Sequence, residues 1–123
     1  MKILIIEDEE ILRKVLEEKF VKEHFDVKTA ADGEAGLALA KSFNPDMILL
    51  DIILPKKDGM KVLAELKANA DFRSTAVIMI SNLGEDEKIK EALALGAVDY
   101  LIKSQHPINE VVEKVKSYLL KAK

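Results

Sequence analysis

The chain of 123 residues lacks cysteine altogether, and this absence excludes disulfide bonds, thiolate metal sites and a thiol nucleophile. It also lacks an excess of positive charge, because 19 lysine and arginine residues are interleaved with 22 acidic ones for a net charge of −3. A basic patch is the minimum for direct nucleic-acid binding, so we expect none. No apolar run is long enough for a membrane span or a signal peptide, and we expect a cytoplasmic protein without membrane association.

What the sequence does contain is enough apolar residues to form the core of one ordinary domain. Hydrophobic residues make up 49% of the chain, and a chain of this length is expected to fold as one unit. No linker or low-complexity tract interrupts it. We therefore expect a single domain over residues 1–123.

Five short apolar runs predict the strands of a sheet, at residues 3–6, 27–30, 47–50, 76–80 and 98–102. Four of them lack polar alternation, which is typical of strands covered on both faces. The remaining run, at 26–30, alternates polar and apolar residues and therefore favours an edge strand.

Segments with helical periodicity follow the apolar runs. Apolar residues recur at helical spacing within 11–20, 35–43, 62–70, 89–93 and 108–119. Asn44-Pro45 and Gly96 stand where the second and fourth of these helices should end. The order is therefore βα repeated five times. This order predicts a doubly wound α/β fold, with a five-stranded parallel sheet, helices on both faces and right-handed crossovers.

Polar residues that follow the predicted strands indicate a functional site. Residues 7–10, Glu-Asp-Glu-Glu, follow the first strand, Asp51 the third, Ser81 the fourth and Lys103 the fifth. Each has a plain structural explanation. The four acids of 7–10 can complement a helix dipole, Asp51 and Ser81 can serve turns, and Lys103 can be a solvated lysine at a strand end. All of these explanations would have to hold at once, at the edge of the sheet where ligands of such folds bind, and that coincidence is improbable. We therefore expect a site there.

The residue types favour phosphate chemistry assisted by a divalent ion. Clustered carboxylates repel one another unless a cation binds or a pKa shifts, and oxygen ligands partly open to water suit Mg²⁺ better than zinc. A carboxylate can attack phosphorus and form an acyl phosphate, which makes Asp51 the candidate nucleophile. Lys103 and the Ser81 hydroxyl would then hold phosphoryl oxygens.

The same residues resemble the receiver domain of two-component response regulators. The resemblance covers essentially the whole chain and rests on Glu7-Asp8, the run from Asp51 through Pro55 to Gly59, Ser81, and Tyr100-Leu-Ile-Lys103. It implies a flavodoxin-like, CheY-like fold with strand order 2-1-3-4-5. It also implies that Asp51 accepts a phosphoryl group from a sensor histidine kinase or a phosphotransfer protein.

The resemblance implies a metal site beside the phosphoacceptor. The carboxylates of Asp8 and Asp51 and the backbone carbonyl of Ile53 would bind Mg²⁺, with Glu7 acting directly or through water. This ligand set agrees with the oxygen-only chemistry that the residues favour by themselves. No other cofactor is implied.

The resemblance also implies a switch that reports phosphorylation. Ser81 and Lys103 would hold the phosphoryl group, and Tyr100 would turn inward as Ser81 moves toward it. Pro55 and Gly59 would shape the loop after the phosphoacceptor, in agreement with their turn chemistry. A downstream protein would then bind the face made by the fourth helix, the fifth strand and the fifth helix.

Several residues depart from the family pattern. Ser104 follows Lys103 where the family usually has proline, so we expect a trans bond or a re-routed loop there. Asn82 is larger than the usual residue and is expected to narrow access to the phosphate. Ile53 and Leu83 are apolar where polar side chains of the family can position hydrolytic water. Our hypothesis is that the aspartyl phosphate is long-lived.

Other functions make different demands on the sequence. A phosphorylation-independent pseudo-receiver, acting only as an interaction scaffold, stays open. An Mg²⁺-dependent aspartyl-phosphate phosphatase typically has a second aspartate where this chain has Ile53. A flavin or nucleotide binder should have a Gly-rich or Ser/Thr-rich loop where residues 7–10 are acidic. We therefore expect a signalling domain that catalyses only its own phosphotransfer and dephosphorylation, not a classical enzyme.

The two histidines lie outside this scheme. His24 is expected on the surface of the first helix and His106 in a loop, and their spacing is not that of metal ligands. We expect neither to be a phosphoacceptor or a ligand.

Overall fold

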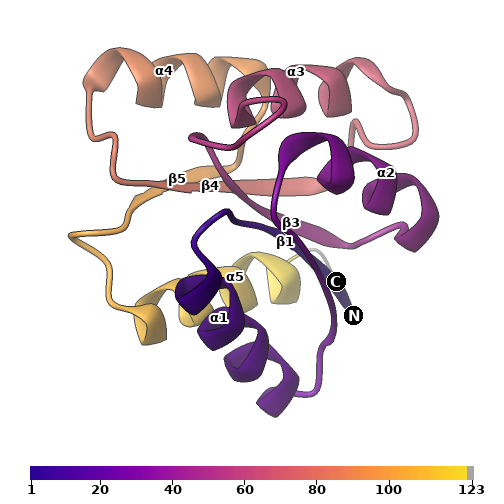
Figure 1. Cartoon of the computed structure of the whole chain (residues 1–123), viewed down its shortest axis with the longest axis vertical. Helices are drawn as coiled ribbons and strands as arrows, with labels where there is room; N and C mark the ends of the chain where they lie inside the picture. The colour runs from indigo at the N-terminus through magenta and orange to yellow at the C-terminus, as the bar shows by residue number, and fades with distance from the viewer. Residues whose placement is uncertain (122–123) are drawn as a thin grey trace.

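The computed structural model describes residues 1–121, in which a five-stranded parallel sheet is flanked by five helices (Figure 1). The strand order is β2-β1-β3-β4-β5, so the predicted fold class and the order 2-1-3-4-5 are confirmed. The elements are β1 Lys2–Ile6, α1 Glu10–Lys22, β2 Asp26–Ala30, α2 Gly33–Phe43, β3 Met47–Asp51, α3 Gly59–Ala68, β4 Ala76–Ser81, α4 Asp86–Leu95, β5 Asp99–Ile102 and α5 Ile108–Lys121.

The predicted domain extends to residue 123, and its last two residues lie outside the described part of the chain. Within residues 1–121, none of the helices has both the length and the apolar character needed to cross a bilayer.

The strands differ in burial as their sequences predict. All five residues of β3 are buried, and β3 lies between β1 and β4. β2 pairs only with β1. Its residues alternate between exposed and partly buried positions, and the last one, Ala30, is buried. The prediction of an edge strand at 26–30 is therefore confirmed.

The alternation of side chains along the strands builds two cores, one on each face of the sheet. In β1, Leu4 and Ile6 pack with residues of α2, α3 and α4, whereas Ile3 and Ile5 pack with residues of α1 and α5. Figure 1 shows the same division, with α2, α3 and α4 on one side of the sheet and α1 and α5 on the other. Both faces of the central strands are thereby buried, which explains their uninterrupted apolar sequences.

The helix ends follow local chemistry. The Asp32 carboxylate accepts a hydrogen bond from the Ala35 backbone N–H at 2.8 Å and caps α2. Asn44 ends α2 and Gly96 ends α4, both in the left-handed conformation, as predicted. Gly96, with φ of 114°, has a backbone that other residues rarely adopt.

His24 corrects one prediction. We expected it on the first helix, but α1 ends at Lys22 and His24 has a positive φ of 69°. The Phe25 N–H donates to the Phe20 carbonyl at 3.1 Å, so the chain turns out of the helix through His24 in the place that glycine often occupies. His106 lies in the loop before α5, as expected.

Candidate functional site

The pleat of the sheet decides which of the polar residues share a face. Glu7, Asp51 and Lys103 each come two residues after a residue of the core beneath α1 and α5, namely Ile5, Leu49 and Leu101. Since side chains two apart in a strand point the same way, all three are directed toward this side. Ile6 is level with Leu50 in the sheet, which brings Glu7 level with Asp51.

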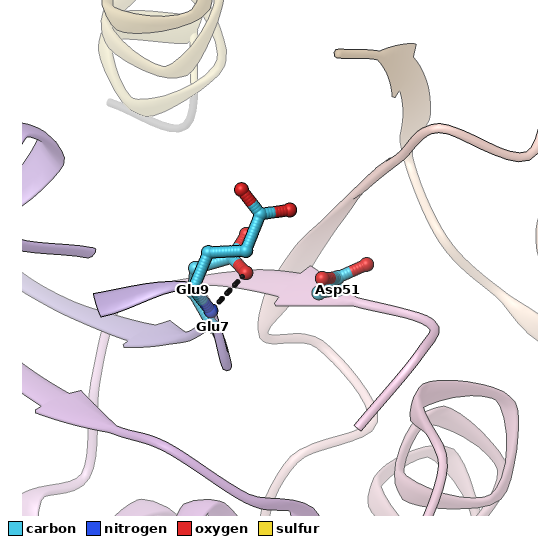
Figure 2. Close-up of side chains that lie close together, drawn as sticks. All are labelled: Glu7, Glu9 and Asp51. Atoms are coloured by element: carbon cyan, nitrogen blue, oxygen red, sulfur yellow. Dashed lines mark hydrogen bonds between the residues drawn. The ribbon is translucent and has the colours of Figure 1, made fainter. Parts of the chain in front are cut away.

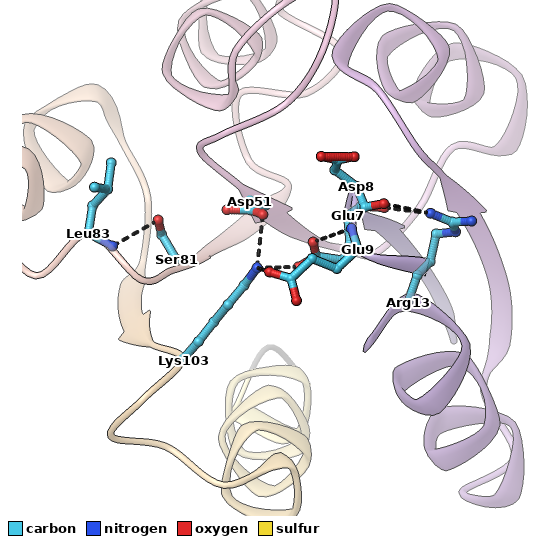
Figure 3. A network of polar contacts seen from close by, with 8 residues as sticks. All are labelled: Glu7, Asp8, Glu9, Arg13, Asp51, Ser81, Leu83 and Lys103. Carbon is cyan, nitrogen blue, oxygen red and sulfur yellow. Dashed lines mark hydrogen bonds and ion pairs between the residues drawn. The ribbon is translucent and has the colours of Figure 1, made fainter. Parts of the chain in front are cut away.

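Lys103 joins three carboxylates at this edge of the sheet. Its Nζ lies 2.9 Å from Glu7 Oε1, 2.9 Å from Glu9 Oε1 and 3.0 Å from Asp51 Oδ2 (Figure 3). Burial disfavours the charged ammonium, but its interactions with the three carboxylates more than offset this effect and raise the pKa of Lys103. The lysine is therefore a fixed cation in the site.

Glu7 is the most deeply placed of these acids. Its exposed fraction is 0%, and its Oε2 accepts a hydrogen bond from the Glu9 backbone N–H at 2.9 Å. Burial raises the pKa of Glu7 to about 7, against the lowering effect of Lys103. Its Oε1 is buried and lies 2.9 Å from Lys103 Nζ in an ion pair, although this contact lacks the geometry of a hydrogen bond. A buried carboxylate oxygen of this kind needs a cation beside it.

Three carboxylates of the described residues gather closely enough to bind one metal ion. Oxygens of Glu7, Glu9 and Asp51 all lie within 4.8 Å of one another (Figure 2). Asp8 is exposed and is not one of these three. It lines a small cavity of about 120 Å³ together with Glu9, Asp51 and Ile53. This oxygen-only donor set fits a hard divalent cation such as Mg²⁺.

Ser81 lines the same small cavity as Asp51 and Lys103, whereas Tyr100 belongs to the core beneath α2, α3 and α4. Ser81 is fully buried, and its hydroxyl accepts a hydrogen bond from the Leu83 backbone N–H at 3.2 Å. The Tyr100 hydroxyl donates to the Leu83 carbonyl, and Tyr100 is only 8% exposed. Burial raises the pKa of Tyr100. The backbone of Leu83 thus connects Ser81 to Tyr100, a role that its apolar side chain did not indicate in the sequence.

The loop after Asp51 is held close to the strand. The Gly59 N–H donates to the Ile52 carbonyl at 2.7 Å, and a Cβ on Gly59 would lie 2.0 Å from the Asp51 carbonyl oxygen. Only glycine allows this approach. The Ile53 side chain is 58% exposed. No cis peptide bond occurs in residues 1–121, so the bond from Lys103 to Ser104 is trans, one of the two conformations that we expected.

Glu9 has a contact that the sequence did not indicate. The sequence allowed Glu9 and Glu10 to complement the dipole of α1, and Glu10 does lie in its first turn, paired with Lys14 at 2.9 Å. Glu9 stands at the N-cap without capping through its side chain, and its carboxylate reaches Lys103 instead. The only sequence signal for this role is its place two residues after Glu7.

Known proteins share this sequence pattern and this fold. Residues 3–116 match the family described as "Response regulator receiver domain". The transcriptional regulatory protein SrrA of Staphylococcus aureus is 36% identical over 117 residues, which cover 95% of this chain and 47% of SrrA. The chain thus spans about half the length of the curated relatives that it matches.

Two solved structures are similar over nearly the whole chain. The receiver domain of the Francisella response regulator 1452 has a TM-score of 0.91 and 30% identity, and the match covers 99% of this chain and 98% of that one. The CheX-CheY-BeF3-Mg²⁺ complex from Borrelia burgdorferi has a TM-score of 0.87 and 33% identity, and the match covers 97% and 89%. By its sequence pattern, its relatives and its fold, the chain belongs to the response regulator receiver domain family of two-component systems.

Proposed function

We propose that this chain is an Mg²⁺-dependent phosphoacceptor of a two-component system, with Asp51 as the residue that is phosphorylated. The observation that carries the proposal is the ion pair of Asp51 with Lys103, at the end of a fully buried strand. The Asp51 side chain is only 6% exposed, and burial of its carboxylate is costly unless the charge has a partner. Lys103 is that partner in the resting site, and it is then available to the phosphoryl oxygens.

The donor is a phosphohistidine of a sensor histidine kinase or a phosphotransfer protein. A carboxylate oxygen of Asp51 attacks phosphorus, a new P–O bond forms, and the P–N bond to the imidazole breaks. The electron pair of the broken bond stays on the imidazole nitrogen, which takes a proton from solvent. Because histidine kinases phosphorylate on the cytoplasmic side, we also propose a cytoplasmic location.

A bound Mg²⁺ would neutralise charge on the phosphoryl oxygens. Glu7, Asp8, Asp51 and the Ile53 carbonyl are the proposed ligands, and the buried Oε1 of Glu7, which pairs with the Lys103 ammonium, supports a cation at this position. Lys103 moves from Asp51 Oδ2 to a phosphoryl oxygen. The Ser81 hydroxyl gives up the Leu83 N–H and donates its own proton to the phosphoryl group.

The change at the partner-binding surface follows from the movement of Ser81. The Leu83 backbone N–H contacts Ser81 and its carbonyl contacts Tyr100, so a displaced Ser81 changes the support of the Tyr100 hydroxyl. We propose that the face of α4, β5 and α5 binds the downstream protein. Leu93 of α4 is 46% exposed and gives α4 an apolar side chain at the surface.

We also propose that the aspartyl phosphate is long-lived. Ile53 lines the cavity around Asp51 with an apolar side chain, and Leu83 is apolar and partly buried. Neither side chain can hold a water molecule in line with phosphorus. The absence of an aspartate at Ile53 also argues against the aspartyl-phosphate phosphatases, which typically need one there.

Intact mass measurement tests the phosphoacceptor proposal. The protein is incubated with acetyl phosphate and Mg²⁺, beside the Asp51→Asn variant and a sample with excess chelator. We expect a phosphate adduct that requires Mg²⁺ and is absent from the variant. An adduct that persists in Asp51→Asn would show that another residue is the phosphoacceptor. If folded protein forms no adduct with this donor or with a phosphorylated histidine kinase, the interaction scaffold becomes the better explanation.

A further inference from the structure

Glu9 contacts Lys103 from the solvent-exposed side of the site. Its Oε1 lies 2.9 Å from Lys103 Nζ, although the two residues are 94 positions apart in the chain. The side chain of Glu9 is 57% exposed, whereas that of Glu7 is 0% exposed and that of Asp51 6%. Of the three carboxylates that share Lys103, only Glu9 can leave the lysine for water without a burial cost.

The ion pair of Glu9 and Lys103 also stands between two cavities. The small cavity at Asp51 and a neighbouring cleft of about 560 Å³ are both lined by Glu9, Asn82 and Lys103. The cleft continues over Ile11 of α1 and Pro107 before α5. The pair is thus part of the wall that the two cavities share. An anionic group that approaches Asp51 past this wall meets the charge of Glu9.

The charges at the site place Glu9 in competition with a phosphoryl group. A phosphodonor brings several anionic oxygens, and Lys103 is the cation that the described residues direct at Asp51. Lys103 gives one of its three ion pairs to Glu9 in the resting site. Phosphoryl oxygens that bind Lys103 in place of Asp51 Oδ2 compete with Glu9 for the ammonium, and the Glu9 carboxylate repels them as they arrive.

We propose that Glu9 is a positioning residue that holds Lys103 in the resting site and restrains the reaction of Asp51 with anionic phosphodonors. When a phosphoryl group binds, Glu9 releases Lys103 to it and turns to solvent. This inference rests on the proposed function of Asp51 as phosphoacceptor. An ion pair with one exposed partner, such as Glu9, contributes about 0.5–1 kcal/mol, so its loss is expected to change rates and affinities by about two- to five-fold.

The test compares Glu9→Gln with Glu10→Gln, which removes the same charge from the next residue without touching Lys103. Glu10 pairs with Lys14 and both are well exposed. With acetyl phosphate and saturating Mg²⁺, Asp51 of Glu9→Gln should be phosphorylated about two- to five-fold faster than wild type. In that reaction a P–O bond to Asp51 forms, the P–O bond to acetate breaks, and acetate leaves. Glu10→Gln should react at the wild-type rate.

Two further measurements distinguish positioning from a structural role. Calorimetry with beryllofluoride and Mg²⁺ should show about two- to five-fold tighter binding by Glu9→Gln. The rate advantage of Glu9→Gln should shrink as NaCl is raised, because salt screens the repulsion. Urea unfolding of each variant shows whether the fold is intact, and an exposed glutamine at this position should preserve it.

The outcomes separate this inference from the proposed function. If wild type forms no adduct on Asp51 and binds no beryllofluoride, the proposed function fails and this inference fails with it. If wild type forms the adduct but Glu9→Gln matches it in rate and affinity, only the inference about Glu9 is overturned. A slower reaction of Glu9→Gln would also overturn it, because Glu9 would then assist the reaction rather than restrain it.

Discussion

Mg²⁺ should stabilise this protein through the carboxylates at the end of β1 and β3. Three carboxylates and one ammonium meet at the site, and Glu7 and Asp51 are 0% and 4% exposed. Their mutual repulsion is poorly screened by solvent and destabilises the folded state. The unfolded chain separates these charges and has no comparable site. A divalent ion that binds only the folded protein therefore raises its free energy of unfolding.

The size of this effect follows from mass action. At a Mg²⁺ concentration about ten times the dissociation constant, the free energy of unfolding should rise by about 1.4 kcal/mol. For a chain of this length, that corresponds to an increase in Tm of about 5 °C. Asp51→Asn removes a carboxylate from the site. If affinity then falls about tenfold, the same Mg²⁺ concentration should add only about 0.4 kcal/mol.

Lys103 gives a second test of this prediction because it pairs with the carboxylate oxygens that would bind Mg²⁺. Its Nζ lies 2.9 Å from Glu7 Oε1 and 3.0 Å from Asp51 Oδ2, where it competes with a bound cation. Lys103→Met should therefore gain more stability from low Mg²⁺ concentrations than wild type does. This variant should also be less stable than wild type without Mg²⁺, because it leaves buried carboxylates unpaired.

Urea unfolding followed by circular dichroism measures each of these changes. The titration is made with MgCl2 and, in parallel, with NaCl at matched ionic strength, which corrects for screening of the net charge of −3. The reasoning would be refuted by equal stabilisation from the two salts. It would also be refuted if Asp51→Asn gained as much from Mg²⁺ as wild type.

Three substitutions test other parts of the structure. Gly59→Ala should lose roughly 2 kcal/mol of unfolding free energy in urea, since the new Cβ would lie 2.0 Å from the Asp51 carbonyl oxygen. Gly84→Ala is its control and should change stability by less than about 0.5 kcal/mol, because the new Cβ meets only the flexible end of an isoleucine side chain; equal effects would show that the Asp51 loop can relax. Tyr100→Phe should cost about 1 kcal/mol through the lost hydrogen bond to the Leu83 carbonyl, and unchanged urea unfolding would contradict that role. Ile53→Asn should shorten the lifetime of the aspartyl phosphate several-fold in intact mass time courses, whereas an unchanged lifetime would show that this position does not control hydrolysis.

Much of the fold could be predicted because its signals are local. Apolar runs without polar alternation indicate strands that are covered on both faces, and Asp26–Ala30 alternates because β2 lies at an edge. Asn44 and Gly96 end their helices through backbone conformations that few other residues adopt. His24 shows the limit of this reasoning. It adopts a conformation typical of glycine, which its residue type does not signal, because the turn from α1 to β2 requires it.

The sequence by itself determined which chemistry is present at the site. Acidic residues, a hydroxyl and a lysine follow the strands of a parallel sheet, so they had to meet at one edge. It also placed Asp51 at the end of β3, where a buried strand gives way to a turn. These conclusions need only the order of elements along the chain and the direction of the strands.

Only the tertiary structure decided which of these residues contact one another. The strand register and the pleat direct Glu7, Asp51 and Lys103 toward one another and Tyr100 into the core on the opposite face, and Lys103 reaches Glu9 across 94 positions of the chain. A contact over such a separation depends on how α1 and the loop after β5 pack on the sheet, and no local pattern encodes that packing. For this reason Glu9 looked like an ordinary helix-end acid in the sequence and proved to be a partner of the site's lysine.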